Sequence, residues 1–284
     1  MNIQRKPEWL RVKLSDGHGM NYTKGVISQF SLNTVCEEAN CPNKIECFGR
    51  KTATFMVLGS SCTRNCRFCN VNFGKPDTVD DDEPENLAKA VSKLGLEHAV
   101  ITSVTRDDLP DGGAAHFARV VEWIRKLSPH TTAEVLIPDF KGSIGSLKTV
   151  VDSVPDVIAH NVETVPRLYG SVCPQSNYKT SLEVLKNIKL LNPAIKSKTG
   201  IMVGLGETKE EMVKVFADLR EVGCEILTIG QYLAPSKQHY PIFKYIHPDV
   251  FEEYKRIALD MGFSHVSSGP FVRSSYHAGE ALKA

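Results

Sequence analysis

Cysteine spacing is the feature that most constrains what this chain can fold into. Six of its eight cysteines lie between positions 36 and 69, in two groups of three. The groups are the arm triplet, Cys36, Cys41 and Cys47, and the loop triplet, Cys62, Cys66 and Cys69. A structural zinc ion needs four closed ligands, whereas a [4Fe-4S] cluster held by only three thiolates keeps one iron open to another ligand. The spacing therefore predicts two such clusters.

The alternative interpretation is a zinc ribbon whose fourth ligand comes from elsewhere in the chain. His160, His239 or His277 would have to supply it. Zinc sites usually pair two C-x2-C knuckles, and the loop triplet, a C-x3-C-x2-C run, has no second knuckle. The pattern therefore favours iron–sulfur chemistry over zinc.

Composition excludes several other classes of protein. The 284 residues include 34 basic and 33 acidic side chains, which gives no overall charge for nucleic acid or an anionic membrane. No apolar run approaches the roughly 20 residues that a membrane helix needs. Met1–Lys13 carries charges and Pro7 where a signal peptide would have an apolar core. The sequence predicts a soluble cytoplasmic protein, in which clustered cysteines are typically metal ligands.

From residue 52 onward, short apolar runs alternate with amphipathic stretches of helical length, which is typical of a parallel sheet with helical crossovers. Six such repeats predict an α/β fold. An open doubly wound sheet fits six repeats, but we favour a partial (β/α)6 barrel with N-terminal and C-terminal extensions closing over its open face.

The expected parts are an arm at 1–50, the barrel at 51–262 and a C-terminal extension at 263–284. Gly17, Gly19 and Gly25 predict that the arm is irregular. The expected strand and helix pairs are Thr52–Leu58 and Glu85–Leu94, His98–Ser103 and Ala114–Leu127, Thr132–Ile137 and Ile144–Val151, Asp156–His160 and Thr180–Leu191, Lys198–Val203 and Lys209–Val222, and Ile226–Ile229 and Pro248–Met261.

The loop triplet follows the first expected strand, at the sheet edge where folds of this kind place their chemistry. Asn161 and Glu163 end the fourth strand on the same rim, and Arg106 follows the second. All three are candidate cofactor contacts. Asn161 could instead cap the next helix, and Arg106 could close a salt-bridged turn with Asp107 and Asp108.

A C-x3-C-x2-C run in the first βα loop of a barrel resembles the signature of radical S-adenosylmethionine enzymes. In such enzymes the open iron chelates the methionine moiety, and one-electron reduction releases a 5′-deoxyadenosyl radical. Further motifs along nearly the whole chain resemble the lipoyl synthase family. They are Leu32–Cys47, Ala53–Gly59, Arg106–Leu109, Glu134–Phe140, His160–Val165, Met202–Thr208, Thr228–Leu233 and Arg273–Ala278.

This resemblance implies a sulfurtransferase that inserts sulfur at C6 and C8 of an octanoyl-lysine on a lipoyl carrier domain. It implies two [4Fe-4S] clusters and S-adenosylmethionine as cofactors, with the arm cluster as the consumed source of sulfur. The fourth ligand of that cluster in the family is a serine of the Arg-Ser-Ser-Tyr motif, here Ser275. The residues alone do not choose Ser275 over Ser274. Alternatively, Ser275 only caps a turn.

The implied partners are octanoylated carrier domains, namely 2-oxoacid dehydrogenase E2 subunits and the glycine cleavage H protein. A reducing protein such as ferredoxin or flavodoxin and a cluster-assembly protein are also implied, with no nucleic acid or membrane and a monomeric state. Cys173 stands where the family usually has arginine. The rivals are biotin synthase, which lacks the arm triplet, methylthiotransferases, which carry a further C-terminal module, and a non-catalytic cluster carrier.

Overall fold

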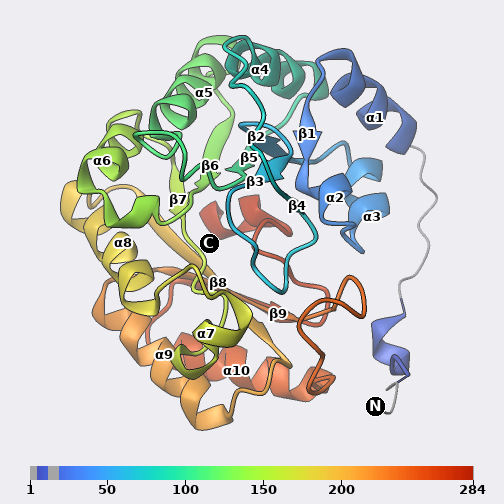
Figure 1. The fold of residues 1–284 in the computed structure, drawn as a ribbon, viewed down its shortest axis with the longest axis vertical. Coiled ribbons are helices and arrows are strands. Elements are labelled where there is room, and N and C mark those ends of the chain that lie inside the picture. Colours follow the sequence, from blue (N-terminus) through green and yellow to red (C-terminus); the bar gives the residue numbers. More distant parts are fainter. Residues whose placement is uncertain (1–4, 12–18, 284) are drawn as a thin grey trace.

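The computed structural model describes residues 5–11 and 19–283, and these are built around one eight-stranded sheet (Figure 1). Seven strands are parallel, and the first pairs antiparallel with its neighbour. In their order across the sheet, the strands are β1 (Asn33–Thr34), β2 (Thr54–Val57), β5 (His98–Ser103), β6 (Thr132–Leu136), β7 (Val157–Ala159), β8 (Lys196–Val203), β9 (Ile226–Gln231) and β10 (His265–Gly269).

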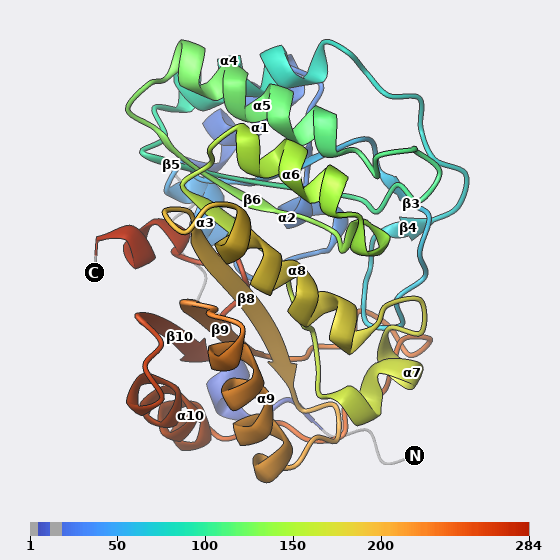
Figure 2. The same cartoon turned by 90° about the vertical axis from the view of Figure 1, so that its left-hand side faces the viewer.

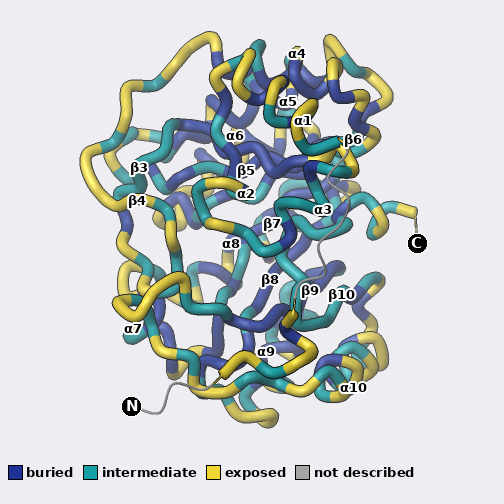
Figure 3. The backbone as a smooth tube through the Cα atoms, turned by 90° about the vertical axis from the view of Figure 1, so that its right-hand side faces the viewer, coloured by how far each residue is buried: buried dark blue, intermediate teal, exposed yellow. Residues whose placement is uncertain are grey.

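Strands β2 and β9 are buried along their whole length, as expected of parallel strands with helical crossovers. Six longer helices pack along the outside of the sheet, and the exposed residues lie mostly on these helices and the loops (Figures 2 and 3). They are α4 (Glu83–Leu94), α5 (Ala114–Leu127), α6 (Ile144–Asp152), α8 (Tyr178–Leu191), α9 (Lys209–Glu221) and α10 (Pro248–Asp260). The short elements are α7 (Tyr169–Val172), β3 (Ser61–Cys62), β4 (Asn72–Phe73), η1 (Glu8–Leu10), η2 (Phe140–Gly142), η3 (Pro166–Leu168) and η4 (Ala278–Leu282).

All six predicted strand–helix pairs are present, and α5 has the predicted bounds. The sheet is a partial barrel, because β1 and β10 are its two edges. Two strands of this sheet were not predicted, and neither was the separate pair β3 and β4. β1 is only two residues long, and β10 lies in the segment expected to be a C-terminal extension, where it continues the parallel sheet beside β9.

The prediction of an irregular arm is wrong for the residues described. The arm contains α1 (Met20–Gln29), α2 (Val35–Glu38) and α3 (Lys44–Gly49). Helix α1 runs through Gly25, because tertiary packing of its buried Val26 and Ile27 outweighs the poor helix propensity of glycine. Gly17 and parts of Met1–Lys13 lie outside the described residues. Within the described part of the chain, none of the helices has the length and apolar character required to cross a membrane.

Candidate functional site

The loop triplet lies where the chain leaves β2, at the carboxyl end of the sheet. Cys62 ends β3, and its Sγ accepts hydrogen bonds from the backbone N–H of Arg64 (3.4 Å) and of Thr105 (3.3 Å). The N–H of Cys69 donates to the carbonyl of Cys66 at 3.1 Å. The loop is thereby folded back on itself, with its thiols beside the loop that follows β5.

The electrostatics show that the three thiols of this triplet are near one another. Burial raises the pKa of Cys66 to about 12, with further contributions from Glu163 and from the thiols of Cys69 and Cys62. Burial likewise raises the pKa of Cys69 to about 11. Burial and mutual repulsion disfavour the thiolate form of these cysteines, and the positive charge of bound iron would offset both effects. Among the residues that the structure describes, no group of three or more His, Cys, Asp or Glu side chains is arranged to hold a single metal ion.

The arm triplet is a second group of converging thiols. Cys36 is buried on α2, Cys41 follows that helix, and Cys47 lies on α3. Burial raises the pKa of Cys47 to about 12, and the charges of Cys36 and Cys41 raise it further. The three thiols, on two short helices and their connection, are therefore near one another, as a cluster would require.

The C-terminal tail, residues 270–283, brings Ser275 to this triplet. Thr54 on β2 donates from its Oγ1 to Ser275 Oγ at 2.7 Å. The polar groups of the same Thr54 partly offset the effect of burial on the pKa of Cys36, so Thr54 is beside both residues. Gly230 lets the tail pass close to β9, since a Cβ there would lie 2.2 Å from the carbonyl oxygen of Val272. Ser275 therefore lies close to the arm, although the two are far apart in the sequence.

Several hydrogen bonds tie the tail to the arm. Asn43 Nδ2 donates to the carbonyl of Phe271 at 2.7 Å. The hydroxyl of Tyr276 lies 3.1 Å from both carboxylate oxygens of Glu46, the neighbour of Cys47, and His277 Nε2 lies 3.2 Å from Glu46 Oε1. We call Glu46, Tyr276 and His277 the latch. These contacts join the two extensions toward the amino ends of the strands, and closure of the open face stays a prediction.

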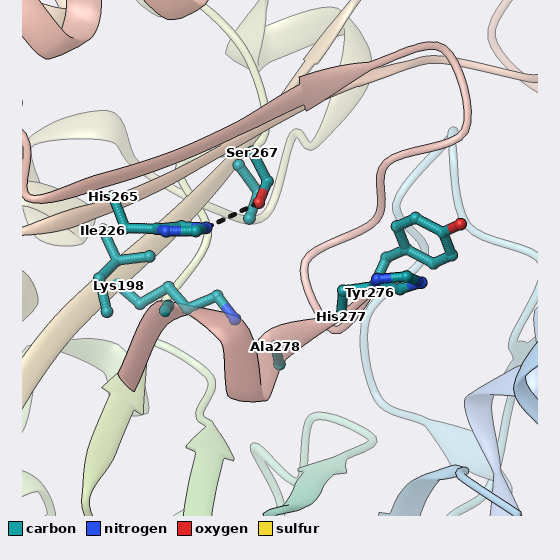
Figure 4. Close-up of a pocket in the computed structure, with 9 residues that line it drawn as sticks. Lys198, Ile226, His265, Ser267, Tyr276, His277 and Ala278 are labelled. Atoms are coloured by element: carbon teal, nitrogen blue, oxygen red, sulfur yellow. Dashed lines mark hydrogen bonds between the residues drawn. The ribbon is translucent and has the colours of Figure 1, made fainter. Parts of the chain in front are cut away.

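Beyond the latch, the tail borders a narrow cleft at the amino ends of the strands. Figure 4 shows Tyr276 and His277 on one side of this cleft, with Lys198 and the hydrogen-bonded pair His265 and Ser267 on the other. The Lys198 ammonium is itself buried and bonds both oxygens of Glu134 at 2.7 and 2.9 Å. This end of the barrel is therefore filled by protein.

The three predicted cofactor contacts differ in their surroundings. Burial raises the pKa of Glu163 to about 7, and Asn161 partly opposes that shift. The Oδ1 atom of Asn161 is buried without a hydrogen-bond partner among the described residues, which fits a site that awaits a donor. The Arg106 guanidinium instead bonds Asp108 at 2.8 Å and the carbonyl of Leu58 at 3.0 Å. These bonds match the salt-bridged turn weighed from the sequence.

Two features near the loop triplet were missed or left open by sequence reasoning. Arg64, inside the triplet, is buried and paired with Asp107 and Asp139. The sequence signal that could have predicted this pairing is an arginine within the cysteine loop together with aspartates after two other strands. Cys173 is buried, and burial with the nearby charges of Glu163 and Cys66 raises its pKa.

Comparison with known proteins gives two kinds of match. The Radical SAM superfamily model matches residues 56–219. A lipoyl synthase of Alkaliphilus metalliredigens is 61% identical over 283 residues, covering 100% of this chain and 98% of the relative. One from Caldicellulosiruptor saccharolyticus is 56% identical and covers 98% of each.

Among solved structures, HydG, described as a maturase of the [FeFe]-hydrogenase, has a TM-score of 0.58 at 13% identity, covering 94% of this chain and 75% of that chain. At that identity, the likeness supports the partial-barrel fold alone. The two lipoyl synthases share more than half of their residues with this chain over nearly its full length, which is enough to show the family. The chain therefore belongs to the lipoyl synthase family of the radical SAM superfamily.

Proposed function

We propose that this protein inserts two sulfur atoms, at C6 and C8, into an octanoyl chain amide-linked to a lysine of a carrier protein. It would use S-adenosylmethionine and consume a [4Fe-4S] cluster as the sulfur source. Family membership supports the reaction class. The observation that carries the proposal is the position of Thr54, which bonds Ser275 and lies beside Cys36.

In this proposal the loop triplet, Cys62, Cys66 and Cys69, holds the first cluster. When bound, that cluster supplies the electron that cleaves S-adenosylmethionine to a carbon radical. The protein's own part is to bind and orient the cofactor. We assign contacts to the cofactor to Glu163, whose charge acts on the Cys66 thiol, and to Asn161, which bonds Glu163 and has a buried Oδ1. Arg106 stays a weaker candidate, because its guanidinium already bonds Asp108 and Leu58.

The arm triplet, Cys36, Cys41 and Cys47, would hold the second cluster with Ser275 as its fourth ligand. A serine oxygen is a harder ligand than thiolate and is less suited to iron–sulfur chemistry. Such a ligand is reasonable on a cluster that must release its sulfur. The Thr54 hydroxyl, at 2.7 Å from Ser275 Oγ, is placed to orient that oxygen.

The proposed substrates are octanoylated lipoyl carrier domains, namely E2 subunits of 2-oxoacid dehydrogenases and the glycine cleavage H protein. A reducing protein such as ferredoxin or flavodoxin would supply electrons, and a cluster-assembly protein would rebuild the spent cluster. We further propose that the protein acts as a cytoplasmic monomer.

Anaerobic reconstitution with iron and sulfide, followed by an assay with an octanoyl-lysine peptide, tests the proposal. We expect about eight irons per chain, as two [4Fe-4S] clusters require. Cys66→Ala should abolish formation of 5′-deoxyadenosine. Cys41→Ala should still form 5′-deoxyadenosine but no lipoyl product, with about half the iron. Normal 5′-deoxyadenosine from Cys66→Ala, or sulfur insertion by Cys41→Ala, would refute these assignments.

A further inference from the structure

Arg64 lies between two cysteines of the loop triplet and makes four hydrogen bonds to carboxylates. Its Nε and Nη2 bond the two carboxylate oxygens of Asp107 at 2.7 and 2.9 Å. Its Nη1 and Nη2 bond those of Asp139 at 2.8 and 2.7 Å. The planar guanidinium thus meets two carboxylates through paired bonds, which the point charge of a lysine could not reproduce. We call Arg64, Asp107 and Asp139 the clamp.

The clamp joins three consecutive loops at the carboxyl end of the sheet. Arg64 follows β2, Asp107 follows β5, and Asp139 follows β6. Asp139 is fixed independently, because it also caps η2 by accepting from the N–H of Lys141 at 2.9 Å. Only about 7% of the Arg64 side chain and 6% of the Asp139 side chain are exposed, so solvent screens this pair weakly. The clamp therefore anchors the cysteine loop to a rigid rim.

Further hydrogen bonds extend the same anchor along the loop. The Thr63 N–H and hydroxyl both donate to the carbonyl of Thr105, at 3.0 and 2.9 Å. The Asp107 N–H donates to Thr63 Oγ1 at 3.0 Å, and the Thr105 N–H donates to Cys62 Sγ. All of these bonds join groups of the protein itself. The loop thus has its own means of keeping a defined conformation.

We propose that the clamp preorganises the Cys62–Cys69 loop before a cluster is bound, and so positions the cluster relative to the barrel. Arg64 is then a positioning residue that acts through geometry. The clamp does not act on the cluster as a positive charge, because one arginine and two aspartates give it a net negative charge. The statement about loop order concerns the metal-free chain, and the statement about the cluster rests on the proposed function.

Hydrogen exchange of the metal-free protein tests loop order directly. In Arg64→Lys, which keeps the charge, we expect amides of residues 62–69 to exchange about tenfold faster or more, because local opening loses buried bonds. Asp139→Asn should act in the same direction. The matched control is Arg125→Lys, since Arg125 bonds Asp156 at 2.6 Å and Thr131 far from the triplet. Parental exchange in both clamp variants, or faster exchange spread over the whole barrel, would overturn the proposal.

Spectroscopy of the reconstituted protein tests the effect on the cluster. The electron paramagnetic resonance signal of a reduced cluster should change when S-adenosylmethionine binds its open iron. We expect this response to be lost or weakened in Arg64→Lys while the arm cluster is retained, and Arg64→Gln should resemble it. A parental response in Arg64→Lys combined with a lost response in Arg64→Gln would show that charge alone matters, and would refute a positioning role. If Cys66→Ala keeps all its iron, the proposed function fails instead.

Discussion

Thr54 connects the two ends of the chain at a single residue. Its hydroxyl donates to Ser275, which is 221 positions away in sequence, and it lies beside Cys36 of the arm. A serine hydroxyl held by a neighbouring donor has a fixed direction for its remaining lone pair. The neighbouring Ser274 has no comparable bond among the described side chains. Geometry therefore favours Ser275, a choice that the residue types left open.

Substituting the two serines separately tests this choice. Ser275→Ala should still assemble iron on the three cysteines but should lose most lipoyl formation, whereas Ser274→Ala should be much milder. Ser275→Cys should bind the cluster at least as well yet turn over poorly, because thiolate is a better ligand for iron–sulfur clusters. Iron content and lipoyl product are measured for each variant. Lipoyl formation at the parental rate by Ser275→Ala would show that this serine is not an essential ligand.

At the scale of elements, the latch holds helix α3 against the tail. Glu46 on α3 accepts from Tyr276 and bonds His277, and it adjoins Cys47. The two segments are held by polar bonds that are only partly buried, and such bonds open more readily than a packed core. We therefore expect the latch to open more readily than the sheet.

Removing the latch hydroxyl should loosen the arm cluster. In Tyr276→Phe, we expect iron of the arm cluster to be lost to a chelator several-fold faster, because a hydrogen bond to a charged group is removed. The control is Tyr22→Phe, since the Tyr22 hydroxyl bonds the Lys93 carbonyl elsewhere on the arm. Chelation is followed by absorbance. Equal rates for Tyr276→Phe and Tyr22→Phe would exclude a role for the latch in cluster retention.

A second link between elements should make stability depend on pH. Glu225 precedes β9 and bonds Lys189 of α8 at 2.7 Å and Lys196 of β8 at 2.8 Å. Burial alone would raise its pKa, but these lysines lower it below the usual 4.5. Because the unfolded carboxyl binds protons more readily, this contribution is complete above about pH 4.5 and is lost as pH falls through the lowered folded pKa.

Replacing this carboxylate should remove that pH dependence. At neutral pH, Glu225→Gln should lower the free energy of unfolding by about 1 to 2 kcal/mol. The difference from the parent should shrink as the pH falls below about 4. Thermal or urea unfolding of the metal-free protein at several pH values measures both quantities. A difference that stays constant or grows on acidification would contradict the assignment.

At the scale of the whole molecule, a buried ion pair occupies the interior of the barrel. Lys198 of β8 and Glu134 of β6 are about 2% and 1% exposed. Removal of one partner leaves an uncompensated buried charge, so Lys198→Met should cost about 3–5 kcal/mol. The double variant with Glu134→Leu should recover much of that loss. Lys196→Met, on the same strand but half exposed, should cost less than about 1 kcal/mol. Denaturant unfolding compares the three, and an equally unstable double variant would refute the argument.

Features that depend on neighbouring residues could be predicted from the sequence. The two cysteine triplets are short-range patterns, and a run such as His98–Ser103 followed by Ala114–Leu127 has a strand and a helix period that can be read locally. The position of the loop triplet at the carboxyl end of the sheet followed from the same alternation.

Contacts between distant segments depend on how the chain packs in three dimensions. Helix α1 forms despite Gly25, because its apolar side chains have a core to enter. The tail supplies a further parallel strand, β10, and then brings Ser275 to Thr54, since closing so long a loop costs little more entropy than closing a shorter one. Arg64 finds Asp107 and Asp139 because parallel strands bring their carboxyl ends to one rim. A local sequence pattern cannot predict which charged side chains will pair at this rim, because their distances depend on the curvature of the whole sheet.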